Sequence, residues 1–218
     1  YSVAVMGKER SISPLTQGLA AALILLVSWL VRTCDLASWR WFYIREDDDW
    51  ETYVRATAAL GDTVTWRSLA AVHGVHDLIP CADSFWHAFL MRYLFGTDAL
   101  AWKQMVAAQT LLSILVFAFV AHAWWGPRAG LVVCALLACS WYLVAWDHAG
   151  YGSTGALLPT ALALWCVTLA QRWHRPFLVL AGIAAGLGCY TYYSARLAIG
   201  LVFLVLWLQP RRELRRLT

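Results

Sequence analysis

The acidic run REDDDW (residues 45–50) holds the side chains of this sequence that are best suited to chemistry. Adjacent carboxylates repel one another when ionised, and a low-dielectric membrane interface favours the protonated form of at least one of them. Both effects bring a carboxylate toward the proton affinity that a general base needs. Two other interpretations stay open. The aspartates cap a surface helix and remain solvated, or their oxygens bind a divalent cation. The aspartates concerned are Asp47, Asp48 and Asp49.

Ionisable residues also stand at the ends of two later apolar runs. Asp147 and His148 end one run, and such groups are costly at the end of a membrane span unless they are used. The alternative interpretation of Asp147 and His148 is a pair at the membrane interface that faces water. Arg196 follows another polar break, where it either extends its charge to the interface or binds a phosphate with its planar guanidinium.

The histidines and cysteines give weaker signals. His73, His76 and Asp77 have a spacing that can converge on a metal, but without a third ligand at a diagnostic spacing a polar surface is the favoured interpretation. Cys34 and Cys81 are both expected on the outer side of the membrane, where they form a disulfide or remain two thiols. The four remaining cysteines lie in apolar runs and act as small hydrophobic residues. They are Cys134, Cys139, Cys166 and Cys189.

The apolar runs predict an all-α membrane bundle. Hydrophobic residues make up 61% of the chain and charged residues 14%, which is unlike a soluble domain. As a helix, residues 15–33 would be ~28 Å long, close to the hydrocarbon thickness of a bilayer. This segment lacks a clear small-residue cleavage site, so we expect a retained anchor rather than a signal peptide. The later runs are residues 104–123, 130–146, 153–170 and 177–208.

The basic residues favour six spans. The last run is too long for one untilted helix, so we expect it to fold back near residues 189–196, where tyrosines and polar groups interrupt it. With that hairpin, the arginines and lysine of the short loops and of the C-terminal RRELRR segment all fall on one side. The positive-inside rule then places both ends of the chain in the cytoplasm and the acidic loop outside, in a plasma membrane of the bacterial inner-membrane type.

The long outer loop carries most of the acidic charge. Ten of the thirteen acidic residues lie within residues 35–98. Within it, residues 50–60 and the aromatic-rich residues 84–94 are expected to form helices along the membrane surface. The fourteen tryptophans suit an aromatic belt at the interfaces and need no ligand. We therefore expect one transmembrane domain over residues 1–218, with residues 35–103 as its outward loop.

Three features together resemble the N-terminal part of a GT-C type glycosyltransferase, the superfamily of protein mannosyltransferases and aminoarabinose transferases. The first is an acidic pair soon after the first span, followed by an aromatic helix. The second is the segment of residues 85–103, where LFGTDALAWKQ resembles the stretch that leads into the family's second span. The third and most specific is the glycine-rich segment of residues 181–196, which ends in Tyr-Thr-Tyr and Ser-Ala-Arg. Such enzymes carry more spans, so the resemblance implies a fragment of a longer protein.

The resemblance implies an inverting transfer of a sugar from a polyprenyl phosphate to a glycan, lipid or protein acceptor at the outer face. Asp48 is the candidate general base, and Asp47 and Asp49 are the neighbours that position the acceptor or tune the base. The family's usual motif is an Asp-Glu pair, which leaves open which aspartate is catalytic. The candidates for substrate contact are Arg196, His148 and Tyr192. No nucleotide sugar, other cofactor or nucleic acid is expected, and the bilayer is the surrounding partner.

Two alternatives belong to other classes of protein. A transporter-like subunit would place ionisable groups at the membrane midplane within broken helices, whereas the middle runs here are almost free of charge. A non-catalytic membrane scaffold would explain the apolar runs and the aromatic belt, but it gives no reason for acids to gather after the first span.

Overall fold

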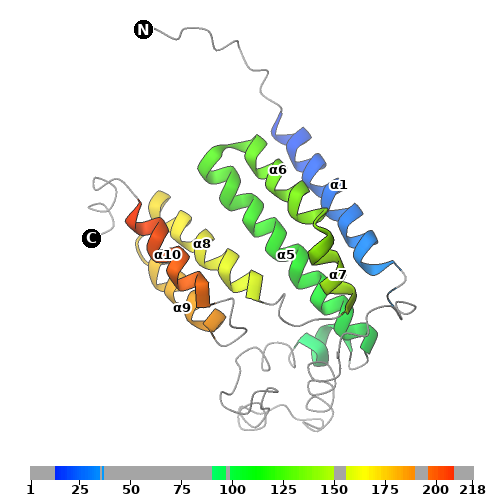
Figure 1. Cartoon of the computed structure of the whole chain (residues 1–218). Helices are drawn as coiled ribbons and strands as arrows, with labels where there is room; N and C mark the ends of the chain where they lie inside the picture. The colour runs from blue at the N-terminus through cyan, green and yellow to red at the C-terminus, as the bar shows by residue number, and fades with distance from the viewer. Residues whose placement is uncertain are drawn as a thin grey trace, which may run out of the picture.

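A computed structural model shows a bundle of antiparallel helices (Figure 1). The structure describes residues 13–34, 36, 90–96, 99–149, 156–189 and 196–208, and all elements within these ranges are helical. The predicted all-α class is therefore confirmed. Successive long segments run in opposite directions, so the start of α1 and the end of α10 lie at the same end of the bundle (Figure 1).

Helix α1 (Pro14–Thr33) forms one edge of the bundle. Ser13 caps its first turn by accepting a hydrogen bond from the Thr16 backbone N–H at 3.1 Å, and Pro14 occupies the first position, where no backbone donor is needed. Its outward face consists of exposed leucines and valines, which suit contact with lipid. The buried residues of this helix are Ser28 and Arg32.

Helix α5 (Ala99–Trp125) runs through the middle of the bundle and contacts α1, α6 and α8. A π-helical turn, η1 (Met91–Phe95), precedes it. Near this end of α5, Trp102 and Met105 are fully buried in a cluster that Phe95 helps to cover. This cluster anchors the segment that leads into the bundle.

Two glycines, one in the turn and one within α6 (Pro127–Ala138), allow α5 and α6 to lie close together. Gly126 has a φ of 92°, a left-handed conformation that glycine adopts without strain, and Pro127 then starts α6. At Gly130 a Cβ atom would lie 2.9 Å from the carbonyl oxygen of Ala118 on α5. The two helices can approach this closely only because Gly130 has no side chain.

Helix α7 (Trp141–Ala149) continues from α6 after a break at residues 139–140, with a bend of 48°. The apolar run of residues 130–146 was expected to form one span, and the structure divides it between α6 and α7, which together are apolar enough to be one bent span. Neither proline nor glycine occurs at the break, and the contacts that stabilise it come from α1, as described below.

Three shorter helices complete the bundle, namely α8 (Leu157–Arg172), α9 (Phe177–Cys189) and α10 (Leu197–Trp207). The expected division of residues 177–208 is confirmed, since α9 ends at Cys189 and α10 begins at Leu197. The two helices lie side by side and antiparallel (Figure 1). At 16, 13 and 11 residues, these helices measure about 24, 20 and 17 Å.

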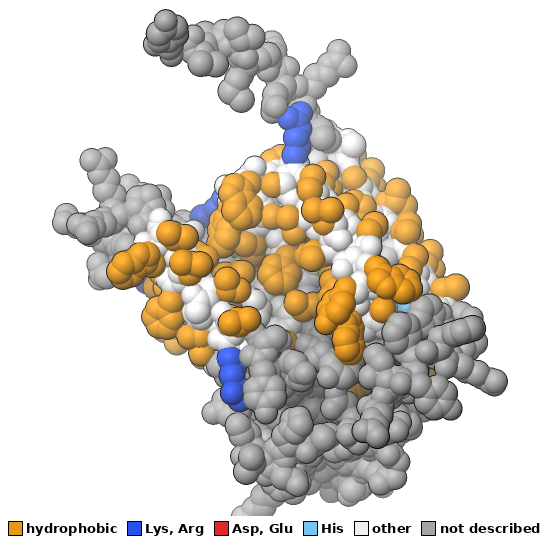
Figure 2. Space-filling model, viewed as in Figure 1, with side chains coloured by type: hydrophobic (Ala, Val, Ile, Leu, Met, Phe, Trp, Pro, Cys, Tyr) orange, Lys and Arg blue, Asp and Glu red, His pale blue; other side chains and the backbone are white. Residues whose placement is uncertain are grey.

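Two helices of the described part, Pro14–Thr33 and Leu100–Trp125, are long and apolar enough to cross a membrane. The bent pair α6–α7 makes a third if it is one span. The viewed face is apolar over the helices and carries basic side chains, coloured as Lys or Arg, at its edges (Figure 2). These features indicate an integral membrane protein. The count of six spans stays a prediction.

Candidate functional site

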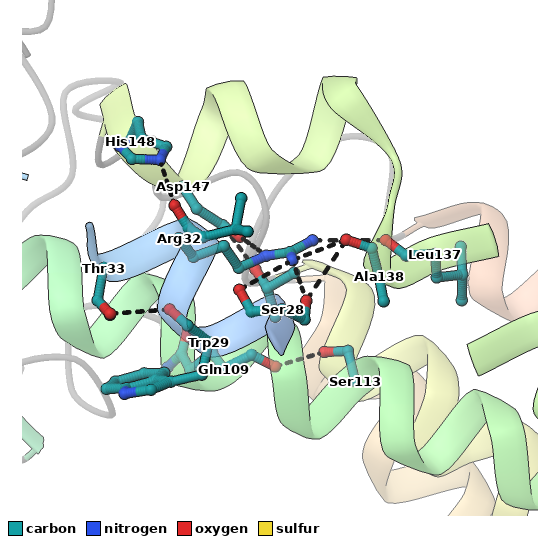
Figure 3. A network of polar contacts seen from close by, with 12 residues as sticks. Ser28, Trp29, Arg32, Thr33, Gln109, Ser113, Leu137, Ala138, Asp147 and His148 are labelled. Atoms are coloured by element: carbon teal, nitrogen blue, oxygen red, sulfur yellow. Dashed lines mark hydrogen bonds and ion pairs between the residues drawn. The ribbon is translucent and has the colours of Figure 1, made fainter. Parts of the chain in front are cut away.

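The strongest polar cluster in the described part of the chain forms where the last turn of α1 meets the break between α6 and α7 (Figure 3). The last carbonyls of a helix have no partner within that helix. Arg32 of α1 supplies donors to them, because its Nη1 donates to the Ala138 carbonyl at 2.9 Å and its Nη2 to the Leu137 carbonyl at 3.4 Å. A guanidinium also suits the negative end of the α6 dipole. Arg32 therefore caps α6 from another helix.

Asp147 of α7 neutralises this arginine. Arg32 Nε donates to Asp147 Oδ2 at 2.6 Å, and both side chains are fully buried. The second oxygen is also satisfied, because Thr110 Oγ1 of α5 donates to Asp147 Oδ1 at 2.6 Å. The carboxylate therefore connects α1, α5 and α7. Asp147 is the only acidic residue among those that the structure describes.

Ser28, one turn before Arg32, completes the arginine's surroundings. Arg32 Nη1 donates to the Ser28 hydroxyl and, at 3.5 Å, to the Ser28 carbonyl. The Ser28 hydroxyl lies 3.4 Å from the Ala138 carbonyl, as a second donor to it. A buried charge is tolerated when its hydrogen-bonding groups are satisfied. Arg32 meets this condition, because it donates hydrogen bonds to oxygen atoms of α1, α6 and α7. We refer to Ser28, Arg32, Thr110, Asp147 and His148 as the polar latch.

His148 of α7 contacts the end of α1, just as Arg32 of α1 contacts the end of α6. Its Nε2 lies 3.0 Å from the carbonyl oxygen of Val31, in the last turn of α1. A protonated Nε2 donates to this oxygen, so α7 caps α1 while α1 caps α6. The His148 ring is 3% exposed. The interpretation of Asp147 and His148 as an interfacial pair facing water is wrong, because both side chains are buried against α1.

The latch holds its groups in fixed positions. Both carboxylate oxygens of Asp147 accept short hydrogen bonds, and the guanidinium of Arg32 contacts Asp147, Ser28 and the two carbonyls of α6. Binding a substrate anion at Arg32 would require one of these bonds to break. The arrangement therefore fixes the direction in which α1 ends.

The predicted site residues are divided between described and undescribed parts of the chain. Arg196 directly precedes α10 and is exposed, at the same end of the bundle as the latch (Figure 1). His148 is in the latch. Asp47, Asp48, Asp49 and Tyr192 lie outside the described residues, as do His73, His76 and Cys81. The surface helix of residues 50–60 also lies outside them, and residues 84–94 are described only from residue 90, where the chain is helical.

Sequence reasoning missed Arg32 and Thr110. A usable signal was present, since Arg32 and Asp147 are ionisable residues of opposite charge that lie in or at the end of apolar runs. Thr110 gave no such signal, because a threonine in an apolar helix commonly bonds to its own backbone. Within the described residues, no three His, Cys, Asp or Glu side chains gather as a metal site would require.

Comparison with known proteins found no matching family model, no matching curated protein and no matching solved structure.

Proposed function

We propose that this chain belongs to a membrane glycosyltransferase of the GT-C type, which transfers a sugar from a polyprenyl phosphate to an acceptor at the outer face. In this proposal the chain crosses the membrane six times, with α8, α9 and α10 as short spans and both ends in the cytoplasm. Asp48 removes the proton of the acceptor as the glycosidic bond forms, and cationic groups stabilise the departing phosphate. The resemblance of residues 45–60, 94–104 and 181–196 to that superfamily supports the proposal.

The observation that best supports the proposal is that the end of α1 and the start of α10 lie at the same end of the bundle (Figure 1). Helix α1 leads toward the acidic run, and its last turn lies at the same end as the end of α7 and the start of α10 (Figure 1). Arg196, at the start of α10, is exposed there. The latch fixes the end of α1, and the acidic run follows α1 in the sequence. A carboxylate and a cation near one membrane face are what such a transfer needs.

The latch also bears on the transporter-like alternative. Transporters use broken helices whose free ends bind ions or substrates near the midplane, and the α6–α7 segment is broken. Here, however, the carbonyl oxygens of Leu137 and Ala138 at the break accept hydrogen bonds from Arg32. A break that is capped by a fixed arginine is unsuited to releasing a transported ion, so the enzyme proposal remains the better supported.

The test is sugar transfer by the whole gene product in membranes, with a panel of radiolabelled polyprenyl-phosphate sugars. Parent protein is compared at equal expression with Asp47→Asn, Asp48→Asn and Asp49→Asn, and with Asp62→Asn as the control from the same loop. We expect one variant of the acidic run to lose at least 100-fold in rate, as the loss of a general base does. Full transfer in all three, or no transfer by the parent with any donor, contradicts the proposal.

A second comparison separates the predicted phosphate contact from general charge effects. Arg196→Gln is expected to raise KM for the donor, whereas Arg175→Gln, which removes a charge at the opposite end of the bundle, leaves KM unchanged. Equal KM values for the two variants would remove Arg196 from the donor site.

A further inference from the structure

The end of the bundle opposite to the latch carries a basic, tryptophan-containing surface that no part of the proposed reaction uses. It consists of two turns, residues 125–128 between α5 and α6 and residues 172–175 between α8 and α9. Both turns lie at the same end (Figure 1). Arg172 joins them by donating from Nη2 to the carbonyl oxygen of Ala123, on the last turns of α5. We refer to these two turns as the arginine end.

The charges at the arginine end have one sign. Arg128, Arg172 and Arg175 are exposed, and His174 is exposed beside them. Asp147, the one acidic residue of the described chain, belongs to the latch at the other end, so the described charges at the arginine end are all positive. The positive end of the α6 dipole adds to this charge, because its N-cap is Gly126, which has no side chain to cap it.

The aromatic residues identify the kind of surface. Trp125 is 70% exposed and Trp173 is 71% exposed, one in each turn. Tryptophan at the end of an apolar helix is typical of the headgroup level of a bilayer, with the ring between hydrocarbon and water. Exposed arginines at that level meet lipid phosphates rather than bulk water, and each basic residue near an anionic leaflet adds to the attraction.

We propose that the arginine end binds anionic phospholipids of the surrounding leaflet and selects them over zwitterionic ones. The phosphate and the net negative charge of the lipid meet Arg128 and Arg175, while Trp125 and Trp173 pack against its glycerol and upper acyl region. Arg172 holds the two turns together through the Ala123 carbonyl. This inference rests on the membrane location of the chain and is independent of the proposed sugar transfer.

The experiment measures the phospholipid that stays with the purified protein. Parent protein is exchanged into mixed micelles with equimolar phosphatidylglycerol and phosphatidylcholine, and retained lipid is quantified by mass spectrometry. The test variant is Arg128→Gln/Arg175→Gln, which leaves the structural contact of Arg172 intact. The matched control is Lys103→Gln/Arg196→Gln, which removes two positive charges from the opposite end.

We expect the parent to retain phosphatidylglycerol in preference to phosphatidylcholine. The preference should fall by roughly fivefold or more in the test variant and stay unchanged in the control. Retention of the two lipids in their bulk ratio, or an equal fall in both variants, overturns the proposal. So does loss of the preference on adding inorganic phosphate, which would indicate a site for a soluble anion. If the double variant fails to fold, Arg175→Gln alone gives the same comparison against Arg196→Gln.

Discussion

Helices α1 and α8 are attached to the same bundle by different kinds of side chain. The buried residues of α1 are Ser28 and Arg32, both polar. Helix α8 has seven buried residues, of which six are apolar, and three of these six are alanines. Lipid is as apolar as a leucine side chain, so burial of hydrocarbon gives membrane helices little reason to associate. They associate through close packing of small residues, as α8 does, or through satisfied polar groups, as α1 does.

This difference predicts which substitutions detach which helix. Loss of a charged partner in the latch should cost more than loss of a close contact, because a buried charge without its partner is unfavourable in a medium without water. A close contact between α5 and α6 should come next, and a single neutral hydrogen-bond donor should matter least.

The largest effect is expected for Arg32→Met. This change leaves Asp147 as a buried carboxylate without its cation and removes the donors to the Leu137 and Ala138 carbonyls. Removal of one partner of a buried ion pair costs about 3–5 kcal/mol. The free energy of unfolding is measured in detergent micelles, with Arg175→Met, an exposed arginine, as the control. Equal stabilities of the two variants would show that the latch does not hold α1.

A smaller loss is expected for Gly130→Ala. The new methyl group would meet the Ala118 carbonyl and the His122 Cβ, both 2.9 Å away, so α5 and α6 must separate. Overpacking of this kind costs about 1–3 kcal/mol. The control is Gly182→Ala in α9, where no atom lies within 4 Å of the added Cβ. The control should gain up to about 1 kcal/mol from helix propensity, and destabilisation by both variants would contradict the role of Gly130.

The smallest loss is expected for Thr110→Val, which removes the donor to Asp147 Oδ1 but keeps the shape of the side chain. Hydrogen bonds between membrane helices contribute about 0.6–1.7 kcal/mol. Thr168→Val is the control, because the Thr168 hydroxyl is equally buried but donates to the Leu164 carbonyl of its own helix. Thermal unfolding in micelles should separate the two, and a larger loss in the control would overturn this interpretation of Thr110.

The helices could be predicted from the sequence because lipid imposes a simple rule. A spanning backbone must satisfy its own hydrogen bonds, so each long apolar run becomes a helix. Residues 15–33 and 104–123 therefore lie within α1 and α5, and the interruption near residues 189–196 separates α9 from α10. Both features depend on local composition.

The break of α6 and the latch could not be predicted in this way. Cys139 and Ser140 have no strong local preference for ending a helix, and the break depends on an arginine more than 100 residues away in sequence. Pairing Arg32 with Asp147 requires knowledge of which helices are neighbours, and composition carries no such information. Part of the predicted site lies outside the described residues, namely Asp47, Asp48, Asp49 and Tyr192.

The most direct test of the latch is a double-mutant cycle on Arg32 and Asp147, with unfolding measured in micelles for the parent, Arg32→Met, Asp147→Leu and the double variant. Each single change leaves one buried charge without its partner, whereas the double change leaves neither. We therefore expect the double variant to be more stable than either single variant, with a coupling energy of at least about 2 kcal/mol. Additive losses would contradict the conclusion that this ion pair docks α1 on the bundle.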